Sequence, residues 1–165
     1  MRMERDFSYV RDNYARISDA VAAAAVRCGR DPGEIALMAV TKTVAPEIVN
    51  CAIDCGIRLL GENRVQEYQS KREFYRPDAQ VHFIGHLQTN KVKYIVDKVC
   101  MIHSVDSERL AAEIQRQCAK IGKTMDVLVE INCGREENKT GVLPENAEAL
   151  CLEVAKMPHL RLRGF

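Results

Sequence analysis

The sequence predicts an α/β fold built from parallel strands, and its pattern indicates this class in two ways. Six short apolar runs alternate with five segments of helical character. Polar residues directly follow most of the runs, as is typical where parallel strands end at the functional edge of a sheet. The composition is 47% hydrophobic and 28% charged over 165 residues, which is that of a globular domain. The alternation therefore implies strands that pair in parallel and are joined by helices.

A helix is expected before the first strand. Within Arg5–Cys28 the apolar side chains recur every three or four residues, which predicts one amphipathic helix. Gly29 and the turn Asp31–Gly33 are residues that end helices. This leading helix precedes the repeated strand–helix units.

The repeated units follow in order along the chain. The expected strands are Ile35–Val40, Arg58–Gly61, Val81–Gly85, Cys100–Val105, Val127–Ile131 and Leu160–Phe165. The expected helices are Pro46–Cys55, Val65–Phe74, Gln88–Asp97, Ser107–Ile121 and Pro144–Met157. Pro46 and Pro144 suit the first helical turn, where no backbone N–H is needed. Gly122 and Pro158 stand where helices end.

Two architectures fit this order, a doubly wound open sheet and a (β/α) barrel. The turn after the first strand, Thr41–Pro46, has no glycine-rich phosphate-binding pattern, which weakens the case for a dinucleotide-binding open sheet. A closed barrel has eight strand–helix units in about 250 residues. We therefore expect one domain over residues 1–165, of the (β/α)8 TIM-barrel type, truncated after its sixth strand and incomplete at the C-terminus.

Composition excludes several classes of partner. Lys and Arg number 24 and Asp and Glu number 23, so there is no basic surplus for nucleic acid or an anionic membrane. No apolar run approaches the roughly 20 residues of a membrane span, and Met1–Asp6 lacks a signal-peptide core. The seven cysteines are an odd number within mostly apolar segments, which predicts reduced thiols buried as small hydrophobes. These features predict a cytoplasmic protein without a metal site.

Lys42 is the most informative residue at a predicted strand end. It follows the apolar run Ala36–Val40, which is typical of a buried parallel strand. Burying an unpaired ammonium is costly. Such a lysine therefore pairs with an acid, reaches solvent at the rim, or serves as an amine that forms Schiff bases. Residue type alone leaves these roles open.

Several motifs occur in an order typical of one family. They are Ala39–Thr43 (AVTKT), Gly61–Glu67 (GENRVQE), His82–Lys91 (HFIGHLQTNK), Ile102–Ser107 (IHSVDS), Asn138–Gly141 (NKTG) and Leu162–Phe165 (LRGF). In combination, from about Val40 to Phe165, they resemble the pyridoxal phosphate homeostasis proteins, single-domain relatives of the barrel domain of alanine racemase.

The resemblance implies a cofactor and residues that bind it. Pyridoxal 5′-phosphate (PLP) is held in this family as an aldimine on the lysine that ends the first strand, which matches Lys42. Asn63 is expected beside the cofactor ring, and Lys139 matches a loop lysine that holds a phosphate or guides PLP transfer. Further rim residues with an expected cofactor contact are His86, Ser104 and Asn132.

The function implied by the resemblance is PLP homeostasis. The protein is expected to buffer PLP and supply it to apoenzymes without robust catalysis, as a monomer or weak homodimer. The main alternative is a PLP-dependent amino-acid racemase. Such an enzyme needs a base on each face of the substrate, and relatives take the second base from an additional domain. We expect no room for that domain in these residues. A barrel aldolase that uses Lys42 without PLP, and a piece with no activity of its own, also remain open.

The sequence departs from the family pattern in two places. Val44 occupies a position where some members have a second lysine. The family's phosphate-binding loops, and its arginine facing the pyridine nitrogen, correspond to positions beyond Phe165. Because barrels commonly bind phosphate after strands seven and eight, we expect weak PLP affinity for these 165 residues alone.

Overall fold

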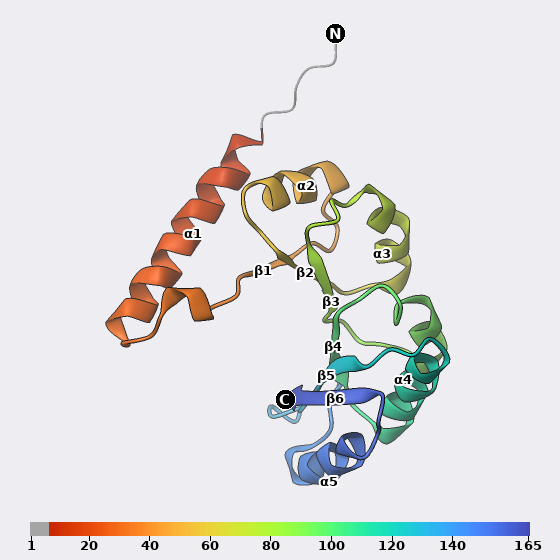
Figure 1. Ribbon diagram of the computed structural model, residues 1–165. Helices are drawn as coiled ribbons and strands as arrows, with labels where there is room; N and C mark the ends of the chain where they lie inside the picture. Colours follow the sequence, from red (N-terminus) through yellow and green to blue (C-terminus); the bar gives the residue numbers. More distant parts are fainter. Residues whose placement is uncertain (1–6) are drawn as a thin grey trace.

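Six parallel strands lie side by side in chain order in the computed structural model, which describes residues 7–165. They are β1 (Met38–Val40), β2 (Leu59–Glu62), β3 (Gln80–Phe83), β4 (Met101–Val105), β5 (Met125–Val129) and β6 (Leu160–Gly164). Each strand pairs in parallel with the one before it, beginning with Met38 opposite Leu59. The predicted α/β class and its parallel pairing are confirmed (Figure 1).

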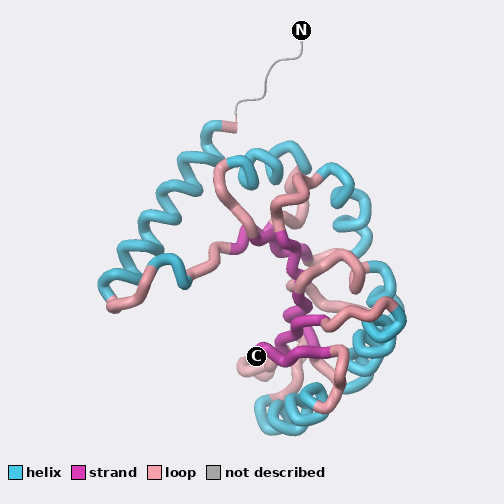
Figure 2. The backbone as a smooth tube through the Cα atoms, viewed as in Figure 1, coloured by secondary structure: helices cyan, strands magenta, loops and turns pink. Residues whose placement is uncertain are grey.

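The helices lie on the outer side of the curved sheet, and the strands form the inner arc (Figure 2). They are α1 (Ser8–Arg27), α2 (Pro46–Asp54), α3 (Val65–Lys71), α4 (Glu108–Lys120) and α5 (Pro144–Ala155). Pro46 and Pro144 occupy the first turns of α2 and α5, as predicted. The part of the predicted first helix at Arg5 and Asp6, like the whole of Met1–Asp6, lies outside the described residues.

Within the described residues, β1 and β6 are the edges of the sheet, so the strands form a six-stranded arc of a barrel. The segment between β3 and β4 differs from the sequence prediction. Gln88–Asp97 was expected to be an α-helix, but the structure has a 3₁₀ helix over Thr89–Tyr94. Its buried residue Val92 and the buried Ile95 that directly follows the helix are three apart, which is the spacing that a 3₁₀ helix places on one face.

The two faces of the sheet differ in burial. The face under the helices is fully buried, at Leu60, Phe83, Ile102 and Val127. Residues that alternate with these, such as His82 and Leu128, are only half-buried on the concave face. The expectation that the first strand is buried is wrong: Val40 is 50% exposed, because β1 is an edge strand and Val40 shares the concave side.

All seven cysteines are free thiols, but the expectation that they are buried is wrong for most of them. Only Cys118 is buried, where it packs under α4. Half-buried thiols are Cys51, Cys55 and Cys151, and exposed thiols are Cys28, Cys100 and Cys133. The exposed positions lie at turns just outside helices and strands, where local apolar runs stop predicting burial. None of the helices in residues 7–165 combines the length and apolar composition needed to cross a bilayer.

Candidate functional site

The ends of β1 and β2 bring Lys42 and Asn63 to the same edge of the sheet. Val40 lies opposite Gly61, and the N–H of Thr41 donates to the carbonyl of Gly61 at 3.1 Å. This bond belongs to the last paired position of the two strands, and Lys42 lies in the turn that follows. Lys42 and Asn63 each come two residues after the pair Val40–Gly61, so both follow the carboxyl ends of neighbouring strands at one edge of the sheet.

The Lys42 side chain is exposed, whereas that of Thr41 before it is 4% exposed. Lys42 and Thr43 are the central residues of a turn, which is closed by the Val44 N–H donating to the Thr41 carbonyl at 3.1 Å. Within residues 7–165, no carboxylate or carbonyl bonds the Lys42 ammonium. Of the roles open to this lysine, the structure favours an amine that reaches solvent at the rim.

Asn63 presents an unsatisfied polar atom just after β2. Its Oδ1 is buried and has no hydrogen-bond partner among the described residues. A Cβ added at Gly85 would lie 2.1 Å from the Asn63 carbonyl oxygen, so the backbones of the β2 and β3 exits touch here. Because buried polar atoms are nearly always paired, the Asn63 oxygen is suited to accept a hydrogen bond from a ligand.

His86 lies on the other side of this edge, near the start of α4. Its Nδ1 is 3.7 Å from Asp106 Oδ2, and its side chain is about half exposed. His86 and Asp106 line a shallow depression that also includes Gln88, Ser107 and Arg109. The polar lining makes this depression hydrophilic, and no contact joins it to Lys42 in the described part of the chain.

Ser104 is placed differently from the other predicted residues. It is 2% exposed and alternates with His103, so it shares the helix-covered face of β4 with Ile102. Its Oγ is buried without a hydrogen-bond partner in the described residues. A ligand on the concave face therefore does not reach Ser104 without a rearrangement of β4.

Asn132 and Lys139 belong to the loop that follows β5. The Asn132 amide accepts from the N–H of Glu136 at 3.2 Å and donates to its carbonyl at 2.9 Å. Asn132 thus shapes the loop with both of its polar atoms. Lys139 is exposed, and Thr140 next to it donates to Glu130 Oε1 at 2.8 Å. The loop leaves the Lys139 ammonium facing solvent.

Two features were missed by sequence reasoning, and the first lies on the concave side. His82 Nδ1 and His103 Nε2 are 2.9 Å apart, so one imidazole donates to the other. Burial lowers the pKa of both rings, and the His103 charge would further lower that of His82. Next to them on the sheet, Asp126 pairs with Arg161 at 3.4 Å and with Arg163 at 3.6 Å. These residues have no sequence signal, because they come from four different strands.

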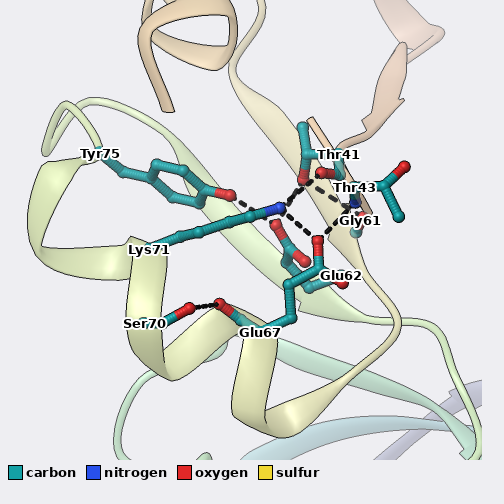
Figure 3. Close-up of polar contacts among 8 residues, drawn as sticks. All are labelled: Thr41, Thr43, Gly61, Glu62, Glu67, Ser70, Lys71 and Tyr75. Atoms are coloured by element: carbon teal, nitrogen blue, oxygen red, sulfur yellow. Dashed lines mark hydrogen bonds and ion pairs between the residues drawn. The ribbon is translucent and has the colours of Figure 1, made fainter. Parts of the chain in front are cut away.

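The second missed feature is a set of charged and polar side chains on the α3 side of the turn that carries Lys42. Figure 3 shows Glu62, Glu67, Lys71 and Tyr75 gathered around the backbone of Thr41 and Thr43. Hydrogen bonds from Lys71 and from the Thr43 N–H lower the pKa of Glu67, which keeps this carboxylate charged. A signal existed, since both glutamates lie in the Gly61–Glu67 motif, but their partners are distant in sequence.

Lys42 and Asn63 offer a free primary amine and an unsatisfied amide oxygen at one edge of the sheet. A primary amine reacts reversibly with aldehydes and ketones, and an amide oxygen accepts from a hydroxyl or N–H group. The pair therefore fits a ligand that carries a carbonyl and a hydrogen-bond donor. PLP has this chemistry, so the residues present fit the cofactor that the resemblance implies.

Comparison with known proteins decides the family. A family model described as "Alanine racemase, N-terminal domain" matches residues 10–165. The chain belongs to this family. Relatives named pyridoxal phosphate homeostasis protein are 42% identical in Aquifex aeolicus over 155 residues and 38% identical in Escherichia coli K12 over 157 residues. Both matches cover 93% of this chain. They span 68% of the length of the Aquifex aeolicus relative and 67% of the length of the Escherichia coli relative.

Solved structures place the chain in the same fold within the alanine racemase N-terminal domain family. A protein of Bifidobacterium adolescentis is 32% identical with a TM-score of 0.90, covering 100% of this chain and 71% of that one. PipY of Synechococcus elongatus, solved with PLP bound, is 28% identical with a TM-score of 0.72, covering 90% and 68%. Alanine racemase of Streptomyces coelicolor shares the fold, with a TM-score of 0.68 and 18% sequence identity. The match covers 95% of this chain and 40% of the racemase chain. The family resemblance read from the motifs is confirmed.

Proposed function

We propose that the chain binds PLP through the Lys42 amine and acts in PLP homeostasis, holding the cofactor and supplying it to apoenzymes without robust catalysis. The observation that carries this proposal is the free Lys42 amine at the same edge of the sheet as the unsatisfied Asn63 oxygen, in a chain 42% identical to a pyridoxal phosphate homeostasis protein. A PLP-bound structure of the related PipY supports the same ligand.

The chain's own residues have distinct roles in this proposal. Bound PLP supplies an aldehyde that reacts reversibly with amines. The Lys42 nitrogen, once it has lost a proton to solvent, forms a carbon–nitrogen bond with the aldehyde carbon, and one water molecule leaves. Asn63 Oδ1 accepts a hydrogen bond from the ligand and so orients it. The exposed Lys139 ammonium is proposed to attract the phosphate.

His86 and Asn132 have supporting roles in the same proposal. His86 stands next to Asp106 at the edge of the sheet and would bound the site on the β3 side. Asn132 would act through the loop whose backbone it fixes at Glu136, because that loop carries Lys139. Ser104 would need a movement of β4 to contact the cofactor, so it is the weakest member of the predicted set.

The first prediction tests Lys42 directly. The chain is mixed with PLP, reduced with borohydride and digested, and pyridoxyl-modified lysines are quantified by mass spectrometry. We expect Lys42 to be modified at least about tenfold more than any other lysine, because proximity and orientation raise the effective concentration of a reacting group. Lys42→Arg should remove the preferred adduct while keeping the positive charge.

The matched control is Lys156→Arg, which changes an exposed lysine paired with Glu153 on α5. It should leave Lys42 labelling unchanged. Equal, unselective modification of all lysines in the wild-type chain would contradict the proposed binding site. Formation of D-alanine from L-alanine and PLP at an enzymic rate would instead favour the racemase, and Lys42 trapping of other aldehydes with indifference to PLP would favour an aldolase.

A further inference from the structure

The turn after β1 adopts a conformation that its sequence does not favour. Thr43, directly after Lys42, has φ of 61°, in the left-handed region. Threonine is branched at Cβ, and branched residues rarely occupy this region because of steric contact with the backbone. Such a conformation persists only where the surrounding structure enforces it. Some neighbouring group must therefore hold Thr43.

Two residues of α3 hold the peptide groups on both sides of Lys42. The Thr43 N–H donates to Glu67 Oε1, and the same oxygen accepts from Lys71 Nζ. Lys71 Nζ also donates to the Thr41 carbonyl at 3.3 Å. Figure 3 shows both side chains extending from one face of the helix toward Thr41 and Thr43. The backbone that carries Lys42 is thus tied to α3 before it and after it.

This contact between helix and turn is partly shielded from solvent. The Glu67 and Lys71 side chains are 18% and 14% exposed, one helical turn apart. Partial burial strengthens such an ion pair relative to one on the surface, and its bonds to the backbone add direction. Exposed pairs of the same type contribute little. The placement therefore points to a structural demand at this turn in particular.

A third side chain, that of Glu62, fixes the Thr41 side chain. Glu62 is fully buried, and its Oε1 accepts from Thr41 Oγ1 at 2.6 Å and from the Tyr75 hydroxyl at 2.7 Å. Thr41 directly precedes Lys42, so a fixed Thr41 side chain restrains the start of the turn that carries Lys42. Glu62 and α3 together restrain rotation of the strand end.

We propose that Glu67 and Lys71 are positioning residues that hold the Lys42 amine in place after β1 by clamping the Thr41–Thr43 backbone. This inference rests on the proposed function, in which Lys42 is the reacting amine. It assigns the α3 ion pair to the geometry of the site, beyond its contribution to folding. Neither residue contacts the ligand in this arrangement; both act through the backbone.

The test compares Lys71→Met with the conservative Lys71→Arg in the full chain, at a temperature where circular dichroism shows both to be folded. We expect Lys71→Met to lower the rate of pyridoxyl labelling of Lys42 about tenfold, because a small misplacement of a reacting group has a large effect on rate. Lys71→Arg should recover most of the wild-type rate. The control Lys156→Met removes a lysine from an exposed pair with Glu153 and should keep the full rate.

A double variant separates positioning from simple stability. Glycine occupies the left-handed region without strain, so in a Thr43→Gly background the turn needs less support. Lys71→Met should then cost clearly less in labelling rate than it does in the wild-type chain. An equal loss in both backgrounds, or a wild-type rate in Lys71→Met, would overturn the clamp. Glu67→Gln, which removes the charge but keeps the size, replaces Lys71→Met if the latter does not fold.

A second readout distinguishes this inference from the proposed function. Competitive labelling with acetic anhydride, without PLP, measures how reactive the Lys42 amine is as a function of pH. We expect Lys71→Met to change the pH profile at Lys42 and to leave the profile of the distant Lys156 unchanged. If the wild-type chain shows no selective PLP adduct, the proposed function fails, while this profile still decides whether Glu67 and Lys71 position Lys42.

Discussion

At the scale of single residues, the contact between Gly85 and Asn63 is the tightest constraint at the edge of the sheet. A Cβ at Gly85 would lie 2.1 Å from the Asn63 carbonyl oxygen and 2.7 Å from its Cα. These are backbone atoms, so they cannot turn aside as a flexible side chain does. The close approach explains why a glycine, and no larger residue, fits after β3.

We therefore predict that Gly85→Ala lowers the free energy of unfolding by about 3 kcal/mol, the upper range for forced overpacking. Urea unfolding followed by circular dichroism measures the change. Gly134→Ala is the matched control, because its nearest neighbour would be the Glu136 side chain at 3.4 Å, an ordinary contact. Similar stability of Gly85→Ala and the wild type would show that the β2 and β3 exits are not in contact.

The histidine pair predicts a pH dependence of stability. Burial lowers the folded-state pKa of His82 and His103 below the unfolded value near 6.5, so the unfolded chain binds more protons once the pH falls below about 6.5. The free energy of unfolding should therefore decrease from about pH 6.5 toward pH 5, above the range in which ordinary carboxylates titrate.

Urea unfolding at several pH values checks this slope. The double variant His82→Gln/His103→Gln should show a clearly flatter dependence between about pH 6.5 and 5, because the titrating pair is gone. Gln88→Ala, which removes no titrating group and leaves the pair intact at 2.9 Å, is the control and should keep the wild-type slope. A double variant with an unchanged slope would mean that other groups cause the effect.

The sequence indicated Lys42 and Asn63 but not the residues that support them. Both follow apolar runs, and the rule that parallel strands end at one edge places such residues together. Glu62, by contrast, accepts hydrogen bonds from Thr41, which follows another strand, and from Tyr75, which lies beyond a helix. A hydrogen bond between such residues depends on how the elements pack, and no local pattern encodes that packing.

At the scale of elements, α1 and α4 are attached to the molecule in different ways. Only Ala25 of the 20 residues of α1 is buried, and Ile17 is 45% exposed. In α4 the buried residues Leu110, Ala111, Ile114 and Cys118 form one apolar stripe against the sheet. Since a helix is stabilised mainly by the face it buries, α1 is the more weakly held of the two.

We predict that amide hydrogens in the middle of α1 exchange at least about tenfold faster than those in the middle of α4, because weakly packed elements open locally without global unfolding. Native-state hydrogen exchange read by mass spectrometry of peptides from each helix measures the difference. The ends of both helices are excluded from the comparison, since they fray. Equal protection in α1 and α4 would show that they unfold as one unit.

The elements themselves were largely predictable, with one instructive exception. The strands and α-helices follow from apolar runs, polar exits and proline at Pro46 and Pro144. Thr89–Tyr94 was not predicted as a 3₁₀ helix, because an apolar spacing of three also occurs on α-helices. The choice between the two depends on how closely the segment packs between its neighbours.

At the scale of the whole molecule, the described strands form an arc with a buried outer face and a partly exposed inner face. The sequence predicted the order and direction of the strands, because alternating strands and helices allow few topologies. It did not predict which face carries His82, His103 and Asp126, since that requires the register between strands. Register is set by packing against the helices, as at Phe83 and Ile102.

The order of the strands also bears on how the chain acquires its structure. Every strand is added next to the one synthesised just before it, from β1 to β6. A chain that leaves the ribosome from its N-terminal end can therefore dock each new unit on a surface that already exists. Pairings between neighbours in sequence close only short loops, which favours rapid folding. The arc thus suits stepwise assembly during translation, with β1, the strand that carries the Lys42 turn, as its first template.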